Sequence, residues 1–370
     1  MASPIKRGRI HTILDVRVFM RVSQRCVAVA AFVYWLLSAA VTKADDAAVA
    51  TVVKNLSIPS AVAIRPGGSA ESYEIFVADV GAGRIVKLVS NEPNATADAI
   101  TEFESKVNPA EPFTSPGPQG LNFLDPMRLV VVGGSDDGRA FVRLYELREP
   151  EIILTASQHV QQLEPPQAAD PSNLDVRVFH AIARTQANDQ VADLLILTAQ
   201  GDEGPAALWR IAVRANTLAE LEVFDAKVPG DALAVPPGVT VGSHGYVVVS
   251  ESAARSTNSR LRFCNPIDGM VALQLEVNLT NIVALAYSPK AGNLFAASFH
   301  SGNGKLGGIY RIDDVGKPAA PACRAVKVAD VSRPTALAFG PDGALYVTAM
   351  GKTDDDKTDS GVLLKVSGDL

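Results

Sequence analysis

Short apolar runs separated by polar turns recur along the chain, and the stretch 333–366 shows this pattern most clearly. Apolar residues at 334–339 lead into a Pro341-Asp342-Gly343 turn, and a second apolar run, an acidic loop and a third apolar run follow. Such runs, separated by Gly- and Asp-containing turns, are typical of antiparallel strands joined by hairpins. We therefore predict three consecutive strands in this stretch.

A strand with one basic residue between apolar neighbours recurs about every fifty residues. This alternation places the apolar side chains on one face and the cation on the other. Six copies occur, at 85–88, 141–144, 208–211, 261–263, 309–312 and 363–366. Two further apolar runs precede each copy, and a fourth follows it at 99–103, 151–154, 220–224, 270–277 and 325–331. Pro-rich insertions interrupt the pattern at 92–118 and 161–172.

The last copy has no fourth run behind it because the chain ends at Leu370. An unassigned apolar run at 50–54 can fill this position by pairing with 362–366, which would close a ring and protect its edges. Repeats of this length indicate blades or solenoid turns. The sequence thus predicts an all-β fold, a six-bladed β-propeller of four-stranded antiparallel blades closed by an N-terminal strand.

The N-terminus has the composition of an export signal. Arg21 and Arg25 precede an uncharged, mostly apolar run at 26–41, and small residues and Ala44 follow. We predict a signal peptide at 1–44, a secreted or periplasmic protein and a single domain at 45–370. Two alternatives remain open: a true start at Met20, and a retained anchor, although the run is short for a membrane span.

Charge narrows the set of partners. The chain has 34 Lys and Arg against 40 Asp and Glu, and residues 1–44 hold seven of the basic and one of the acidic residues, so the net charge of residues 45–370 is −12. An acidic surface repels nucleic acids and anionic membranes. We expect a monomer with an unidentified protein or small-molecule partner at one face of the ring, no nucleic acid, and no membrane contact after signal cleavage.

The pattern Pro334-x-x-Leu337-Ala338-Phe339-x-Pro341-Asp342-Gly343-x-Leu345-Tyr346-Val347 resembles the repeats of NHL and gluconolactonase/strictosidine-synthase-like (SMP-30, TolB-like) propellers. The resemblance covers most of residues 45–370 and is best in the first, fifth and sixth repeats. It implies the propeller fold, which hosts hydrolases, lyases, dehydrogenases and binding modules alike.

Gluconolactonase-like enzymes hold a divalent cation at the start of the innermost strands, and calcium is the cofactor that the resemblance allows here. The corresponding positions are uncharged: Ser60, Gln119, Pro237, Val283 and Thr335. Asn281 is out of phase with them. A hard cation needs several oxygen ligands, usually some of them charged, so we expect the metal site of these enzymes to be missing.

Histidine chemistry is the second possibility, since quinone-dependent sugar dehydrogenases of the propeller class use a His base. His159, His180, His244 and His300 follow the predicted signal, and no two have motif spacing. We name His180 and His300 as catalytic candidates, because one lies near an inner strand and the other in a loop between second and third strands. The alternative is that each is a structural or surface histidine.

Acidic residues gather in the loops between second and third strands, which all project from one face of such a ring. Five of the six loops carry them, and His300 and Asn303 occupy the fifth. Converging carboxylates could bind a cation or a basic partner; the alternative is a solvated turn face. The candidates are Asp79, Asp136, Asp137, Asp202, Glu203, Glu251, Asp354 and Asp356, with Asp355 and Asp359 beside the last pair.

Two cysteines remain beyond the predicted signal. Cys264 ends a third strand and Cys323 begins a fourth strand one repeat later. Because both fall at the same face in adjacent repeats, and export leads to an oxidising space, they form a disulfide candidate; two buried thiols are the alternative.

The chain lacks the residues that the resembling enzymes use, so its sequence favours an exported propeller that binds or scaffolds. The alternatives are a metal-dependent hydrolase of the lactonase type that uses loop carboxylates, and a quinoprotein-like sugar dehydrogenase.

Overall fold

The computed structural model describes residues 47–106, 112–148, 152–166, 176–185, 192–201, 207–225, 237–252, 258–300, 307–315, 322–351, 353–354, 357–358 and 360–370. The predicted signal peptide lies outside these residues, and the compact unit that contains them runs from Asp46 to Leu370. In the described part of the chain, no helix is long and apolar enough to cross a membrane.

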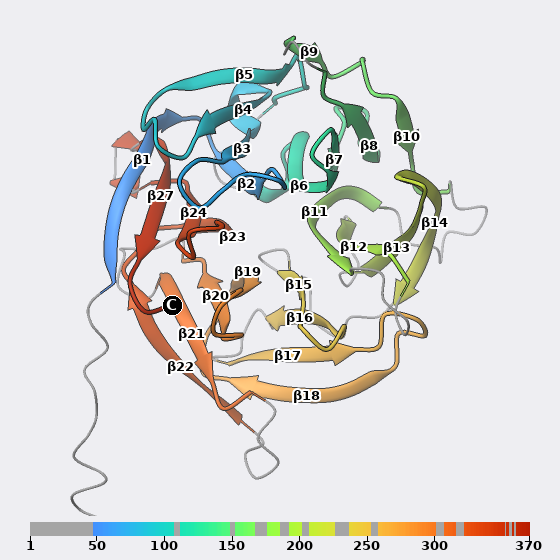
Figure 1. The fold of residues 1–370 in the computed structure, drawn as a ribbon. Helices are drawn as coiled ribbons and strands as arrows, with labels where there is room; N and C mark the ends of the chain where they lie inside the picture. The colour runs from blue at the N-terminus through green and yellow to red at the C-terminus, as the bar shows by residue number, and fades with distance from the viewer. Residues whose placement is uncertain are drawn as a thin grey trace, which may run out of the picture. The chain divides into compact units, whose positions relative to one another are not determined.

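The fold is all-β, and the antiparallel strands fall into six four-stranded groups, which we call sheets 1 to 6. The first three sheets follow the chain from its inner to its outer strand (Figure 1). Sheet 1 contains β2 (Pro59–Ile64), β3 (Glu74–Asp79), β4 (Arg84–Val89) and β5 (Thr96–Thr101); sheet 2 contains β6 (Gly117–Asp125), β7 (Arg128–Gly134), β8 (Ala140–Glu146) and β10 (Gln161–Leu163); sheet 3 contains β11 (Val176–Thr185), β12 (Leu194–Gly201), β13 (Ala207–Arg214) and β14 (Thr217–Asp225).

The other three sheets repeat this plan, except that the outer strand of sheet 6 comes from the start of the described chain. Sheet 4 contains β15 (Val239–Val241), β16 (Val247–Ser252), β17 (Ser259–Cys264) and β18 (Val271–Val277); sheet 5 contains β19 (Ile282–Tyr287), β20 (Leu294–Ser298), β21 (Gly308–Asp313) and β22 (Ala322–Ala329); sheet 6 contains β23 (Pro334–Phe339), β24 (Leu345–Ala349), β27 (Gly361–Ser367) and β1 (Ala48–Leu56).

Strand β1 pairs antiparallel with β27, as the apolar run at 50–54 predicted. Ala50 lies opposite Lys365, Thr51 opposite Leu364 and Val53 opposite Leu363. This pairing joins the two ends of the described chain in one sheet and confirms the predicted partner of 362–366.

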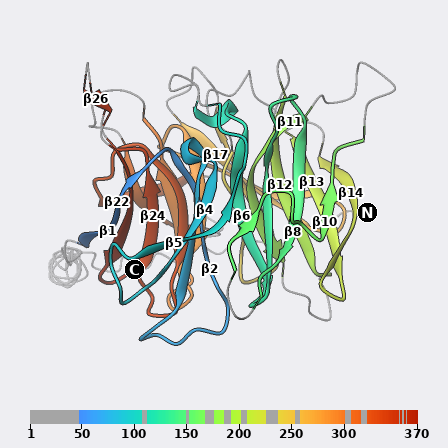
Figure 2. The ribbon, with the colours of Figure 1, turned by 90° about the horizontal axis from the view of Figure 1, so that it is seen from above.

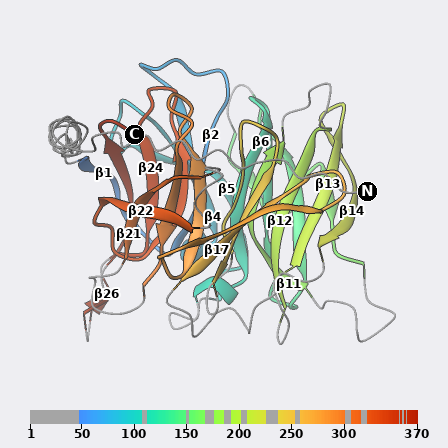
Figure 3. The ribbon, with the colours of Figure 1, turned by 90° about the horizontal axis from the view of Figure 1, so that it is seen from below.

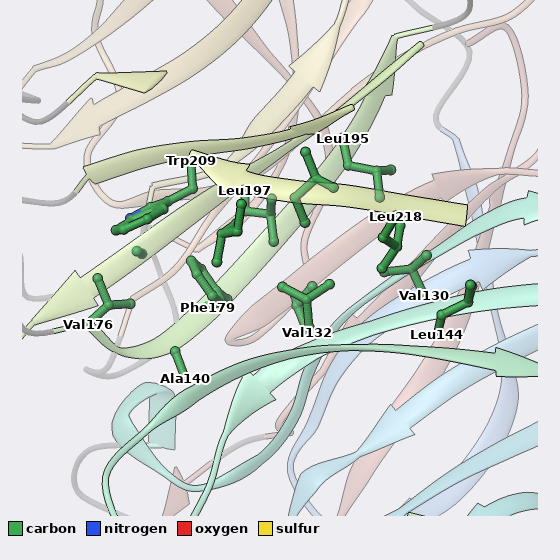
Figure 4. Packing of buried hydrophobic residues seen from close by; sticks show 14 of the residues in the cluster. Val130, Val132, Ala140, Leu144, Val176, Phe179, Leu195, Leu197, Trp209 and Leu218 are labelled. Carbon is green, nitrogen blue, oxygen red and sulfur yellow. The ribbon is translucent and has the colours of Figure 1, made fainter. Parts of the chain in front are cut away.

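The innermost strands contact one another in a closed order. Strand β2 packs against β6, which packs against β11, and the order continues through β15, β19 and β23 back to β2. Apolar side chains fill the spaces between neighbouring sheets, as between sheets 2 and 3 (Figure 4). Views from above and below show strands of neighbouring sheets running side by side (Figures 2 and 3).

The outer strand of sheet 2 differs from the prediction. We expected it at 151–154, but β9 (Leu154–Thr155) pairs in parallel with β5 of sheet 1, and Gln161–Leu163 completes sheet 2 instead. A second parallel pair joins β18 of sheet 4 to β22 of sheet 5. Two 3-10 turns, η1 (Val80–Ala82) and η2 (Pro112–Thr114), and a small hairpin of β25 (Thr353–Asp354) and β26 (Lys357–Thr358) complete the described elements.

Candidate functional site

A β-bulge occurs in five of the six innermost strands, near the start of four of them and in the middle of β11. The register of the first strand pair shifts at this point in sheets 1, 2, 3, 5 and 6. A bulge turns the extra residue away from the regular ladder and often lies next to a site. The residues in these bulges are Ser60, Gln119, His180 with Ala181, Val283 and Thr335.

The backbone just before these strands is left-handed in four sheets. Ile58, Asn281 and Arg333 have φ of 60°, 52° and 51°, and Gly117 has φ of 122°. A Cβ at Gly117 would lie 2.9 Å from the Glu104 carbonyl oxygen, so only glycine fits there without a shift. In each of these four sheets, the residue with positive φ turns the chain sharply at the entry to the inner strand, close to the bulged residue.

The six innermost strands enclose a cavity of about 550 Å³, which every one of them lines. The bulged residues Ser60, Gln119, His180, Val283 and Thr335 line it at the end where the inner strands begin, and we call them the rim. Most of the wall beyond the rim is Ala, Val, Leu and Ile. A concave, largely apolar site with a few polar groups is the usual form of a small-molecule pocket.

The hydroxyl groups of the rim connect neighbouring sheets. Ser60 Oγ donates a hydrogen bond of 2.9 Å to the Pro118 carbonyl in sheet 2, and Thr335 Oγ1 donates one of 2.7 Å to the Pro59 carbonyl in sheet 1. Gln119 Nε2 donates to the Ser115 carbonyl at 2.9 Å. Because each donor is buried and already used, these groups hold the ring together.

The rim does not suit a divalent cation. It holds no carboxylate, Val283 offers no ligand atom in its side chain, and the hydroxyls of Ser60 and Thr335 donate to backbone carbonyls. Among the described residues, no group of three or more His, Cys, Asp or Glu is placed to hold a metal. The donor set therefore disagrees with the calcium site that the resemblance implies.

The acidic loop residues that the structure describes are each engaged close to their own strands. Asp79 is fully buried and accepts a 2.6 Å hydrogen bond from the Ser57 N–H, with Arg84 3.4 Å away. Burial raises the pKa of Asp79 to about 6. Glu251 is also buried and pairs with Arg262 at 2.9 Å.

Asp136 and Asp137 lie in the loop between β7 and β8. Asp136 pairs with Lys106, and Asp137 lies 2.6 Å from Arg139 and accepts a hydrogen bond from Ser135 Oγ, which holds its pKa below the usual value. The remaining members of the predicted acidic face, Asp202, Glu203, Asp356 and the side chain of Asp354, lie outside the described residues. The described carboxylates thus bind separate cationic partners and do not converge on one site.

The structure brings one of the two candidate histidines to the cavity. His180 is buried on β11, lines the rim and meets the Phe113 ring edge to face, with ring centroids 6.5 Å apart. His300 is half-buried just after β20 and does not line the cavity. His159 packs on Tyr145, and His244 is exposed in the turn between β15 and β16.

No disulfide joins Cys264 to Cys323. Cys264 is buried in the apolar cluster between sheets 3 and 4, and Cys323 in the cluster between sheets 4 and 5. The two thiols therefore face opposite sides of sheet 4. They also lie at opposite ends of β18, since Cys264 is opposite Val271 and Cys323 is opposite Val277. The sequence suggested one common face for both residues, but it shows neither the stagger between neighbouring sheets nor the side of a sheet that a residue faces.

Sequence reasoning missed Phe113, which the Pro-rich insertion carries into the site. It belongs to η2, lines the cavity and contacts the Phe299 ring at a centroid distance of 5.0 Å. The only signal in the sequence was a large aromatic residue inside a polar, Pro-rich stretch. The local sequence does not show which part of the fold such a loop contacts.

The sequence matches no family model, and a search of curated proteins finds no match. Solved structures do match. An oxidoreductase (glucose dehydrogenase) described from Thermus thermophilus has a TM-score of 0.55 and 16% identity, covering 87% of this chain and 100% of its own.

Two further structures show the same similarity. A luciferin-regenerating enzyme has a TM-score of 0.54 and 14% identity, covering 87% of this chain and 95% of its own. A protein described as a gluconolactonase has a TM-score of 0.51 and 13% identity, covering 88% of this chain and 93% of its own. At these identities the likeness concerns the fold alone: the chain shares its β-propeller fold with these three proteins.

Proposed function

We propose that the unit is a six-bladed β-propeller in which sheets 1 to 6 are the blades. Three observations support this: the closed order of contacts among the six innermost strands, the cavity that all six line, and the pairing of β1 with β27. Closure by the two chain ends leaves short, protected edges.

We further propose that the protein is an enzyme that acts on one small organic molecule in the central cavity, with His180 as the acid–base group. Three titratable side chains line the described cavity, namely His180, Arg184 and Tyr287. Burial raises the pKa of Tyr287 to about 12, and the hydrogen bond to Asp193 raises that of Arg184. Histidine is the side chain that ordinarily exchanges protons near neutral pH. The position of His180 at the rim is the observation that carries the proposal.

Among the reactions that a histidine base allows, we favour metal-independent hydrolysis of a small neutral ester or lactone. His180 would take a proton from the water that attacks the carbonyl carbon, and would return it to the alkoxide oxygen that leaves as the acyl–oxygen bond breaks. The names of the structural neighbours, a gluconolactonase and a glucose dehydrogenase, support a substrate of that size. A dehydrogenase that uses an anionic quinone is less well supported, because Arg184 is bound to Asp193 at 2.6 Å and to the Phe123 and Leu124 carbonyls.

A binding module without catalysis is the second candidate. The rim hydroxyls favour it, since both are used between sheets rather than directed at a ligand. In either case we propose an exported, monomeric protein, as the N-terminal composition and the acidic charge suggest.

The test is a hydrolase assay with a panel of small lactones and esters, with and without EDTA. We expect turnover that EDTA does not reduce, and a loss of about 10²- to 10⁴-fold in kcat/KM for both His180→Ala and His180→Gln. His159→Ala, a histidine outside the cavity, should keep full activity. If no substrate of the panel is turned over, but some raise the melting temperature of wild type, the binding module is the better description.

A further inference from the structure

Two described stretches, 102–106 and 112–116, lie between β5 and β6, and we call them the strap. The strap leaves sheet 1 and enters sheet 2, yet Phe113 packs against Phe299 of sheet 5 and His180 of sheet 3. Sheet 5 lies three positions from sheet 2 in the closed strand order, so Phe113 reaches from the entry of sheet 2 across the opening to the opposite sheet.

Both limbs of the strap are tied down. In the first limb, Glu104 accepts a hydrogen bond from the Asp136 N–H, and Lys106 pairs with the Asp136 carboxylate. In the second limb, the Ser115 carbonyl accepts the 2.9 Å hydrogen bond from Gln119 at the rim. Asp136, part of the predicted acidic face, thus anchors the strap.

The Phe113 side chain is held by the far side of the ring. It is only 9% exposed and shares an apolar cluster with Val283, Phe299 and Met350. The Arg333 guanidinium lies over the Phe299 ring, with Cζ 5.7 Å from the ring centroid. An aromatic ring packed on several partners keeps a fixed position and excludes water.

We propose that Phe113 closes the rim over His180 and thereby controls access to it, so that reagents and substrates reach His180 from this face only when the ring moves aside. The effect of this closure on catalysis rests on the proposed function. The closure itself depends only on Phe113, the strap anchors and His180. Phe113 is a positioning and access residue, and His180 is the group that it covers.

The experiment measures how fast diethyl pyrocarbonate modifies each histidine of the wild-type protein, by peptide mass spectrometry at pH 7. His244, which is exposed, and His159 serve as internal references. In wild type we expect His180 to react far more slowly than His244. In Phe113→Ala we expect the rate at His180 to rise at least about tenfold, with the two reference rates unchanged.

A matched control separates opening of the rim from general loosening. Phe263 of sheet 4 is similarly buried, at 8% exposure, and does not line the cavity. Phe263→Ala should therefore leave the rate at His180 unchanged. Asp136→Asn weakens one anchor and keeps the ring, so it should raise the rate at His180 by a smaller factor than Phe113→Ala does.

Equal rates at His180 and His244 in wild type, or an unchanged rate at His180 in both Phe113→Ala and Asp136→Asn, would overturn the proposal. Should Phe113→Ala fail to fold, the labelling is done with Phe113→Leu and Asp136→Asn. Both variants keep an apolar side chain at position 113 and so disturb the fold less. The proposal then stands if the rate at His180 rises in these variants, and it falls if the rate is unchanged in both. The labelling needs no substrate, so it tests the closure separately from catalysis. If Phe113 shields His180 but the His180→Ala variant stays active, the catalytic role of His180 is refuted and the closure still holds.

Discussion

Two junctions between neighbouring sheets are built in different ways. Sheets 2 and 3 meet through apolar side chains such as Val132, Leu197 and Phe179 (Figure 4). Sheets 6 and 1 meet where the chain ends close the ring, and their interface adds buried polar groups. There the hydroxyls of Tyr73 in sheet 1 and Tyr346 in sheet 6 are 2.8 Å apart. Beside them, Lys365 and Asp342 form a partly exposed ion pair within sheet 6 at 2.8 Å.

The difference shows where directional bonds are needed. Sheets 2 and 3 are close in sequence, so the connection between them already limits how they meet, and non-directional burial is enough. Sheet 6 takes three strands from the end of the chain, and only its outer strand β1 is linked directly to sheet 1. Hydrogen bonds in a buried site depend strongly on distance and angle, so the tyrosine pair specifies one alignment of the closing sheet.

The largest effect is expected at the apolar junction. Phe179 is fully buried and meets Trp209 edge to face at 6.1 Å. Phe179→Ala should lower the free energy of unfolding by about 3–5 kcal/mol, because it removes the contacts and leaves a cavity. Urea unfolding measures this loss, and Val223→Ala, at an exposed position of β14, should change stability by less than about 0.5 kcal/mol. A small loss at Phe179 would mean that this junction is loosely packed.

A pH-dependent effect of intermediate size is expected at the closing junction. Asp79 binds the N–H of Ser57 in the link from β1 to β2, and burial raises its pKa to about 6 from 3.8. A carboxyl group with a raised folded-state pKa favours the fold when protonated. That contribution is complete below pH 3.8 and is lost as the pH rises through 6.

Wild type should therefore lose on the order of 2–3 kcal/mol relative to Asp79→Asn between about pH 4 and about pH 7. The comparison of the two unfolding free energies across this range cancels the other titrating groups. A constant difference would show that the fold leaves the pKa of Asp79 near its ordinary value.

The smallest effect is expected from the tyrosine pair. Tyr73→Phe removes one hydroxyl and leaves that of Tyr346 buried, so we expect a loss of about 1–2 kcal/mol. The double variant Tyr73→Phe/Tyr346→Phe should lose less than the sum of the two single variants, because both partners are then apolar. Strict additivity would contradict a direct bond between the two hydroxyls.

The repeated strands and the ring closure could be predicted because they depend on local alternation and on one unpaired strand at each end. The outer strand of sheet 2 could not, since the short run 152–163 divides between two sheets according to which edges are available. Similarly, the neutral residues at 60, 119, 283 and 335 indicated a rim without carboxylates, and the structure places them there. That Phe113 covers this rim depends on contacts with residues almost two hundred positions away, which local pattern does not encode.

The pairing of β1 with β27 also brings the ends of the folded unit together. A Cβ at Gly368 would lie 3.5 Å from the Cα of Ala47. A short linker could therefore join residues 47 and 368, and the chain could be cut open in a surface turn such as the one at Gly138 instead. Such a circular permutant would join β1 covalently to sheet 6 and would divide sheet 2 between the new chain ends. It would show whether closure can be moved from sheet 6 to another sheet.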